Sequence, residues 1–229
     1  LGNAAMRYEN FGGYELYHPV EFEKVNRQIL YLNQLMESAT QEKNVFREIP
    51  VPPGITGFSH AFYNALEGQL HAGFMMEELK RKFLALGGAI QTGIEIESIE
   101  DNGDQVQLIN RLAIPIEARK VIVTINAFAG KLLPGIDVHG ARNHVLVTNE
   151  IPDLKWKGCF HYDKGFYYFR NIGNRILLGG ARNRDIENEN TEQFGFNEVI
   201  LETLTRFLHD HLVDADTCRI DYQWSGIIG

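Results

Sequence analysis

A short run of aromatic and basic residues is where this sequence is best equipped to bind a small ligand. His161-Tyr162-Asp163 is followed closely by Phe166-Tyr167-Tyr168-Phe169-Arg170. Side chains alternate between the two faces of a strand, so Tyr168 and Arg170 would share one face. A hydroxyl beside a guanidinium suits the capture of a small carboxylate through paired hydrogen bonds. The alternative is an antiparallel sheet that packs its aromatic rings across strands, with Arg170 solvated at an edge.

Further basic residues flank this run. Arg142 and His144 alternate onto one face of the preceding expected strand, and Arg182 follows the pair Gly179-Gly180. Glycines at such a place either allow a ligand to approach the backbone closely or mark a bulge. Each arginine taken alone is more often a surface residue than a ligand-binding one, so both interpretations stay open at this point.

Composition and charge argue against several other classes of protein. The 229 residues are 44% hydrophobic, which is enough for a sizeable core. The formal net charge is −8 and no Lys/Arg run longer than three residues occurs, which disfavours a nucleic acid or an anionic membrane as partner. No apolar run approaches the length of a bilayer span.

Common catalytic and metal-binding motifs are missing as well. The sequence has no G-x-S-x-G, no H-E-x-x-H and no Walker sequence. Cys159 and Cys218 lack ligand spacing and are expected to be reduced thiols of a cytoplasmic protein. His209 and His211 stand two residues apart at a helix end, so they would point to different faces and share no metal.

The spacing of apolar residues predicts an α+β fold with a large mixed, mostly antiparallel sheet and helices packed on one side. Helices are expected over 19–40, 73–86, 128–133 and 196–208. Strands are expected over 44–49, 60–70, 120–125, 144–149, 158–162, 166–171, 175–178 and 219–228, with a meander over 94–116. Residues 1–18 and 183–195 are expected to be loops.

Five stretches, each weak alone, follow one another in an order and spacing typical of one family. They are Gly68-Gln69-Leu70-His71 leading through Gly87-Gly88-Ala89-Ile90 to Gly93-x-x-Ile96-x-x-Ile99, Lys120-Val121-Ile122-Val123-Thr124-Ile125-Asn126-Ala127-Phe128, Arg142-x-His144-Val145-Leu146-Val147-Thr148, Leu177-Leu178-Gly179-Gly180-Ala181-Arg182 and Tyr222-Gln223-Trp224-Ser225-Gly226-Ile227. With a fainter loop ending at Gly12-Gly13, they resemble the amino-acid oxidase superfamily of flavoenzymes, which includes glycine oxidase, D-amino-acid oxidase and sarcosine oxidase. The resemblance covers most of residues 60–229, and His144 replaces the family's Gln.

This resemblance implies an FAD enzyme that removes a hydride from the carbon next to an amine, giving an imine that hydrolyses. It also implies that an Arg holds the substrate carboxylate and that a Tyr lines the pocket facing the flavin. By position, the candidates for substrate binding are Tyr168, Arg170, Arg182 and His144. The candidates for cofactor contact are Ile96, Thr124, Asn126, Ala127, Gly12, Gly13, Trp224 and Gly226.

The chain departs from the family at one motif. No G-x-G occurs, so the turn that would hold the FAD pyrophosphate is not among these residues. The expected organisation is a remnant of the flavin-proximal loop at 1–18 and a substrate-binding domain at 19–229, with cofactor-domain strands at about 73–135 and 219–229. A truncated fragment of this kind is expected to lose FAD, to be inactive alone and to self-associate through exposed cut edges.

A second interpretation comes from a different class. The aromatic-rich sheet would then recognise a small ligand or a partner chain, with no redox cofactor, as a non-catalytic binding or interaction module.

Overall fold

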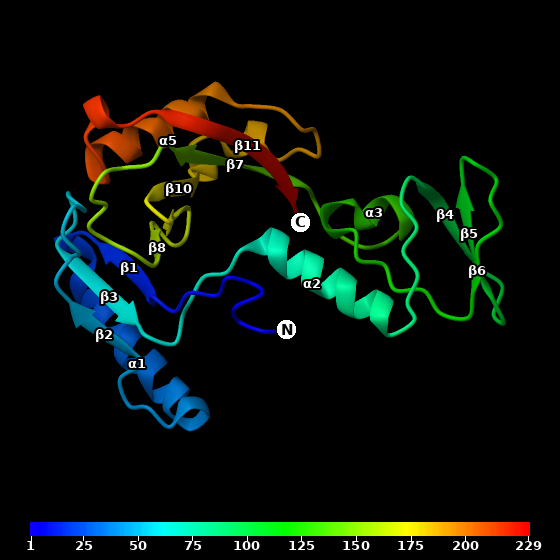
Figure 1. Ribbon diagram of the computed structural model, residues 1–229, viewed down its shortest axis with the longest axis horizontal. Coiled ribbons are helices and arrows are strands. Elements are labelled where there is room, and N and C mark those ends of the chain that lie inside the picture. Colours follow the sequence, from blue (N-terminus) through cyan, green and yellow to red (C-terminus); the bar gives the residue numbers. More distant parts are fainter.

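A mixed sheet of eight strands forms the centre of the molecule in this computed structural model, which describes residues 1–229 (Figure 1). Across the sheet the strands are β11 (Ile220–Ile228), β7 (Ala141–Thr148), β10 (Arg175–Gly180), β9 (Tyr167–Ile172), β8 (Cys159–Tyr162), β1 (Gly13–Tyr17), β3 (His60–Asn64) and β2 (Phe46–Ile49). Only β1 and β8 pair in parallel, and the other neighbours are antiparallel. The expected α+β class and mostly antiparallel sheet are confirmed.

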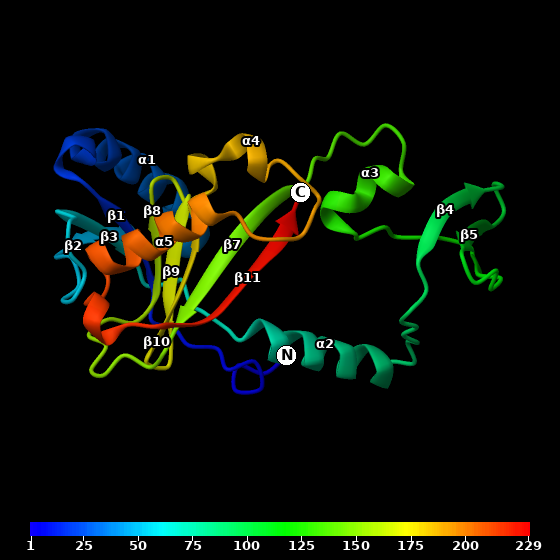
Figure 2. The ribbon, with the colours of Figure 1, turned by 90° about the horizontal axis from the view of Figure 1, so that it is seen from above.

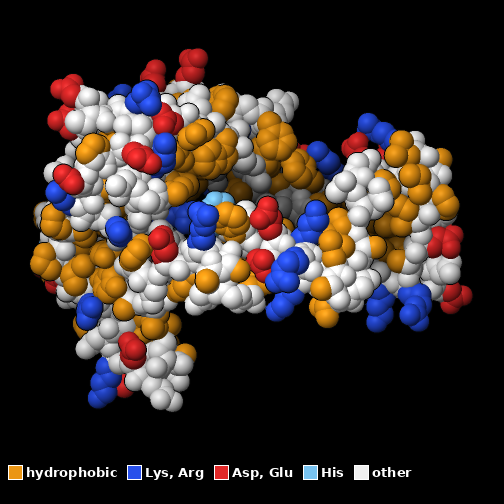
Figure 3. Space-filling view, viewed as in Figure 1, with side chains coloured by type: hydrophobic (Ala, Val, Ile, Leu, Met, Phe, Trp, Pro, Cys, Tyr) orange, Lys and Arg blue, Asp and Glu red, His pale blue; other side chains and the backbone are white.

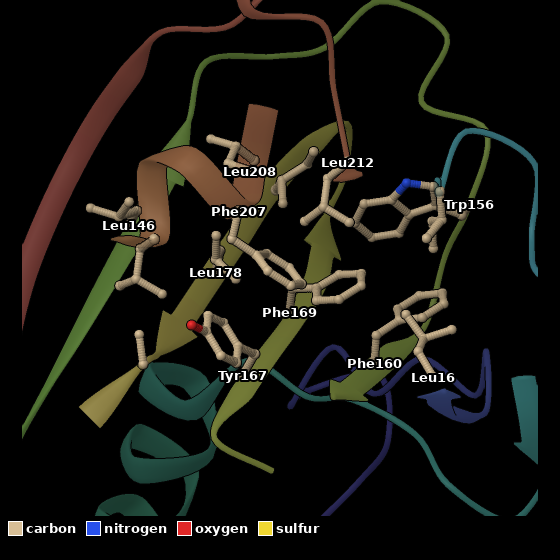
Figure 4. Close-up of a cluster of buried hydrophobic side chains, with 14 of the residues drawn as sticks. Leu16, Leu146, Trp156, Phe160, Tyr167, Phe169, Leu178, Phe207, Leu208 and Leu212 are labelled. Atoms are coloured by element: carbon tan, nitrogen blue, oxygen red, sulfur yellow. The ribbon is translucent and has the colours of Figure 1, made fainter. Parts of the chain in front are cut away.

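The main hydrophobic core lies between one face of this sheet and α5 (Glu198–His211), as Figure 4 shows. Alternate strand residues point into it, and Tyr167 and Phe169 of β9 are 2% and 1% exposed. From the helix, Leu204 and Leu208 stand one turn apart and are fully buried. The buried residues of the strands and of the helix therefore belong to one core.

The other long helix, α1 (Phe22–Thr40), packs on the opposite face of the sheet. Its Val25 and Ile29 meet Phe62 of β3 in a small separate core. Phe62 follows Ala61, which belongs to the main core, so these neighbours point to opposite sides. The helices thus cover two faces rather than the one side expected, because β3 is apolar on both of its faces.

Residues 72–139 leave this body as an extended arm (Figures 1 and 2). The arm contains α2 (Ala72–Ala85), α3 (Ala129–Leu132) and a three-stranded sheet of β4 (Ile96–Asp101), β5 (Val106–Asn110) and β6 (Glu117–Ala118). The expected meander is confirmed. None of the residues of α2 is buried, so most of the apolar face of this amphipathic helix is uncovered within the chain, and its contact with Arg7 is confined to Phe74.

Three segments differ from the sequence-based expectation. Residues 13–17 form β1 in the middle of the sheet rather than a loop, and Leu16 is fully buried there. Residues 120–125 form no strand, and Ile122 is 87% exposed, because no other strand pairs with this apolar run. The expected loop over 183–195 contains the short helix α4 (Ile186–Glu189), whose last residue is fully buried.

The remaining elements follow the expected positions within a few residues. The hairpin between β9 and β10 turns at Gly173, whose positive φ of 58° is a conformation that glycine adopts readily. None of the helices is long and apolar enough to cross a membrane.

Candidate functional site

The face of the sheet turned away from α5 carries side chains that could hold a ligand. Residues paired on neighbouring strands point to the same side, so the register defines which of them share a surface. One row crosses β11, β7, β10, β9, β8 and β1, and consists of Trp224, Val145, Gly179, Tyr168, His161 and Glu15. We call this row the open face.

Tyr168 stands at the centre of the open face. Its ring lies directly over Gly179, where an added Cβ would come within 2.5 Å of the ring. A glycine is therefore needed for this close approach. The hydroxyl of Tyr168 has no hydrogen-bond partner in the protein, and burial raises the pKa of this phenol. The hydroxyl thus stays protonated and free to donate to a ligand.

Beside Tyr168 is a small pocket of about 180 Å³, which we call the Arg182 pocket. It is lined by Asn143, Lys164, Gly165, Phe166, Tyr168, Gly180, Arg182 and Ile228. Arg182 has one weak side-chain contact, 3.5 Å from Nη1 to Oδ1 of Asn190, and neither Arg182 nor Lys164 forms an ion pair. Two cationic side chains without a carboxylate partner make this pocket suited to an anion.

A larger pocket of about 480 Å³ adjoins the first, and we call it the Glu15 pocket. It is lined by Glu15, Tyr17, Ile29, Leu32, Phe46, Glu67, His161, Lys164, Gly165 and Tyr168. His161 Nδ1 lies 3.1 Å from Oε1 of Glu15, and this hydrogen bond raises the pKa of His161. The two pockets share Lys164, Gly165 and Tyr168, so they adjoin each other, and we call the pair the depression.

The four candidates for substrate binding divide into two groups. Tyr168 and Arg182 line one pocket together. Arg170 lies on the same face as Tyr168, but it lines neither pocket. Its Nη1 instead donates a hydrogen bond to the carbonyl oxygen of Leu70 at 3.0 Å. His144 points to the opposite face, towards the core, and is fully buried.

His144 belongs instead to a buried polar cluster. Its Nε2 lies 2.9 Å from Oε2 of Glu189, and Arg142 Nη2 donates to Oε1 of Glu189 at 2.8 Å. Asn197 Nδ2 donates to the same oxygen at 2.9 Å. Burial lowers the pKa of His144, so its ring is held neutral. Burial opposes ionisation of Glu189, yet the hydrogen bonds from Arg142 and Asn197 outweigh this and lower the pKa of that carboxyl.

This cluster has a clear structural consequence. The ion pairs of the fully buried Glu189 with Arg142 and His144 connect the segment after Arg182 with strand β7. Arg182 is contacted by the same segment through Asn190. The cluster therefore helps to hold Arg182 beside the open face.

The candidates for FAD contact lie partly near this site and partly far from it. Trp224 is 43% exposed on the open face, and an added Cβ at Gly226 would meet no atom within 4 Å. An exposed aromatic plane beside a bare glycine surface fits a flat flavin ring. Asn126 adjoins this end of β11, because its Oδ1 accepts a hydrogen bond from Gly229 N at 2.9 Å.

The other cofactor candidates are more scattered. Gly12 and Gly13 lie at the start of β1, and the carboxylate of Glu67 packs over Gly13. Ala127 is 1% exposed in the turn that precedes α3. Ile96 and Thr124 lie on the arm, and Ile96 begins β4 near the far end of the arm (Figure 2). Trp224 and Gly226 thus lie at one end of the body, which Asn126 adjoins, whereas Ile96 lies on the arm.

Several residues of the two pockets were not singled out by sequence reasoning. Lys164 lies in the turn between β8 and β9, and Glu67 lies in a loop, so neither follows a periodic pattern. Glu15 falls in a segment that was expected to be a loop. Its alternation with Leu16 was the one signal available, because it places Glu15 opposite a buried residue.

Comparison with solved structures shows a shared fold. Glycine oxidase from Geobacillus kaustophilus superposes with a TM-score of 0.78 at 15% identity, covering 97% of this chain and 60% of that one. L-Proline dehydrogenase from P. horikoshii gives 0.77 at 14% identity, with 97% and 61% covered. L-Amino acid deaminase from Proteus myxofaciens gives 0.72 at 12% identity, with 96% and 62% covered. The chain therefore spans about three fifths of the length of these relatives.

Sequence comparison identifies the family directly. No curated protein matches the sequence significantly. Residues 4–229, however, match the profile of the family described as FAD dependent oxidoreductase. The match covers nearly the whole chain and agrees with the resemblance drawn from the five sequence stretches. The chain belongs to the FAD dependent oxidoreductase family that includes the amino-acid oxidases.

Proposed function

We propose that this protein takes part in the oxidation of a small amino acid or amine, with FAD as the hydride acceptor. The observation that carries the proposal is the Arg182 pocket, where an unpaired guanidinium and the free hydroxyl of Tyr168 face one small space. The family match supports FAD chemistry, and it favours this function over a binding module without a cofactor.

In this proposal Arg182 holds the substrate carboxylate, and Lys164 adds a second positive charge at the same end. Tyr168 donates a hydrogen bond that orients the bound molecule, since its raised pKa keeps the hydroxyl protonated. Gly179 lets the ring of Tyr168 lie against the sheet, which holds the phenol beside the pocket. When bound, FAD accepts a hydride from the carbon next to nitrogen, and the resulting imine hydrolyses in water.

The flavin ring is proposed to cover the open face at Trp224 and Gly226, with Asn126 nearby. These residues supply a flat surface but no cradle of backbone N–H groups for the pyrophosphate, and no G-x-G turn occurs among residues 1–229. We therefore propose that these residues alone retain FAD weakly and turn over little substrate. A flavin spectrum that survives incubation with FAD and gel filtration would contradict this part.

Substrate binding is tested in the flavin-loaded enzyme that carries these residues. Arg182→Met should raise KM for an amino acid about 10–100-fold, by removing a charge-assisted contact. Tyr168→Phe should lower kcat/KM by a smaller factor. The matched controls are Arg206→Met and Tyr31→Phe, which alter exposed residues outside both pockets. Kinetics unchanged by the two pocket substitutions would refute the assigned roles.

The location of the protein is a separate proposal. Cys159 and Cys218 are both free, which supports a reducing, cytoplasmic environment. Cell fractionation tests this, and recovery from an oxidising compartment would contradict it.

A further inference from the structure

The depression around Tyr168 is polarised in charge. Arg182 lines only the Arg182 pocket, Glu15 and Glu67 line only the Glu15 pocket together with His161, and Lys164 lies at the junction and lines both. The two ends are joined through Lys164, Gly165 and Tyr168, which line both pockets. A ligand that spans the depression would therefore meet positive charge at one end and negative charge at the other.

The two carboxylates are held on the same surface. Glu15 lies on the open face, and the carboxylate of Glu67 packs over Gly13, two residues before Glu15 on the same strand. Glu67 Oε1 accepts a hydrogen bond from Asn64 Nδ2 at 2.9 Å, which fixes its direction. Neither glutamate forms an ion pair with a Lys or Arg. The hydrogen-bond partner of Glu15 is His161, which is 40% exposed.

Part of the wall of the Glu15 pocket is apolar. Ile29 and Leu32 of α1 line the Glu15 pocket together with Phe46 and Tyr17. Such a wall suits a chain of methylene groups, and the carboxylates suit a terminal ammonium group. The pocket of about 480 Å³ is larger than the Arg182 pocket of about 180 Å³, so the longer part of a ligand fits on this side.

We propose that the depression takes an amino acid whose side chain ends in a second ammonium group, with that group at Glu15 and Glu67. The carboxylate end of the same molecule sits at Arg182. This inference rests on the proposed function for the carboxylate end, and it adds the class of substrate: a basic amino acid with an alkylammonium side chain.

The test is a calorimetric titration of the chain at pH 8 with DL-lysine and, separately, with DL-norleucine. The two probes have the same carbon skeleton and differ in the terminal amine, and racemic probes remove the question of chirality. Lysine should bind at least about tenfold more tightly than norleucine, as one charge-assisted contact provides. Equal affinity of the two probes, or no binding of lysine, would overturn the proposal without any variant.

A double variant then locates the preference. Glu15→Gln with Glu67→Gln should reduce the difference between lysine and norleucine to less than about threefold. Glu23→Gln with Glu37→Gln, which removes the same charge from the exposed side of α1, should leave the difference unchanged. An undiminished preference in the folded Glu15/Glu67 variant would place the amine elsewhere and overturn the assignment.

These titrations need no flavin, so they separate this inference from the proposed function. A lysine preference that depends on Glu15 and Glu67, found together with no amino-acid oxidation in the flavin-loaded enzyme, would leave the subsite standing and remove the redox role. Oxidation of norleucine and lysine with equal kcat/KM would do the reverse.

Discussion

The body and the arm of this molecule bury their apolar side chains to very different degrees. All 17 residues of the main core belong to the body, which comprises residues 1–71 and 140–229. In the arm, residues 72–139, the buried residues are Asn110 and Ala127. Figure 3 shows hydrophobic side chains spread over the surface of the arm.

This difference indicates that the body buries its apolar side chains without help from another chain, whereas the arm does not. The body satisfies its apolar pattern within the chain, because α5 and α1 cover opposite faces of the sheet. The arm has an equally regular pattern, but Leu79, Phe83 and Leu86 are 43%, 49% and 86% exposed. Exposed apolar surface of this extent marks an interaction site. We expect the apolar face of α2 to contact another protein surface, whereas the body alone forms the Arg182 and Glu15 pockets.

The largest expected effect compares one aromatic residue from each region. Phe169→Ala in the body should lower the free energy of unfolding by about 3–5 kcal/mol, because a fully buried ring leaves a cavity. Phe83→Ala in α2 should change the free energy of unfolding by less than about 0.5 kcal/mol. Urea denaturation measures both. Equal decreases in the free energy of unfolding would contradict this account, since they would show the arm to be packed as tightly as the body.

A second test addresses the buried polar cluster. Glu189→Gln leaves Arg142 and His144 buried against a neutral amide, so the free energy of unfolding should fall by about 3 kcal/mol. The matched control is Glu192→Gln, whose ion pair with Lys131 at 2.8 Å is solvent-exposed and should contribute less than about 0.5 kcal/mol. If both variants unfold at the same urea concentration, the cluster does not stabilise the body.

The dependence of stability on pH sharpens the same point. His144 is neutral in the fold with a lowered pKa, whereas the unfolded chain gains a proton near the ordinary value of 6.5. Stability should therefore be full above that value and should fall as the pH drops below about 6.5 towards 5.5. His161, whose pKa is raised, contributes in the opposite direction, so the melting temperature is best followed in a His161→Gln background. A melting temperature that rises on acidification in that background would contradict the assignment.

The smallest effect concerns association through the arm. Sedimentation velocity of the protein should show a weight-average coefficient that rises with concentration, because apolar patches pair in water. Replacing Phe83 and Leu86 together by Lys should suppress this rise. A wild-type protein that stays monomeric over the whole concentration range would show that the apolar face of α2 does not mediate self-association.

Local patterns predicted much of the body. The helical stripes of α1 and α5 and the hairpin of β9 and β10 depend on nearby residues, so spacing and turn chemistry were enough to find them. β1 was missed because its place is set by pairing with β8 and β3, which are distant in the chain. The strand expected at 120–125 was wrong for a related reason: an apolar run becomes a strand only where another strand can pair with it.

The candidate site divides in the same way. Alternation along β9 placed Tyr168 on the same face as Arg170, and the glycine pair before Arg182 indicated a close approach or a bulge, but the group that approaches Gly179 is the ring of Tyr168 and not a ligand. Glu189 could not be paired with His144 from spacing, since 45 residues separate them and α4 is too short to show a period. Glu15 and Glu67 come together only because Glu67 folds back over β1. Long-range contacts of this kind leave no periodic trace in a sequence.

The most direct test of the central claim is the anaerobic reduction of bound flavin by amino acids. The flavin-loaded enzyme that carries these residues is mixed with small and basic amino acids in the absence of oxygen, and the visible flavin absorbance is followed. The account predicts that the absorbance bleaches with at least one amino acid, and that Arg182→Met bleaches far more slowly at the same concentration. A flavin that dithionite reduces, but that every amino acid and amine leaves oxidised, would contradict it.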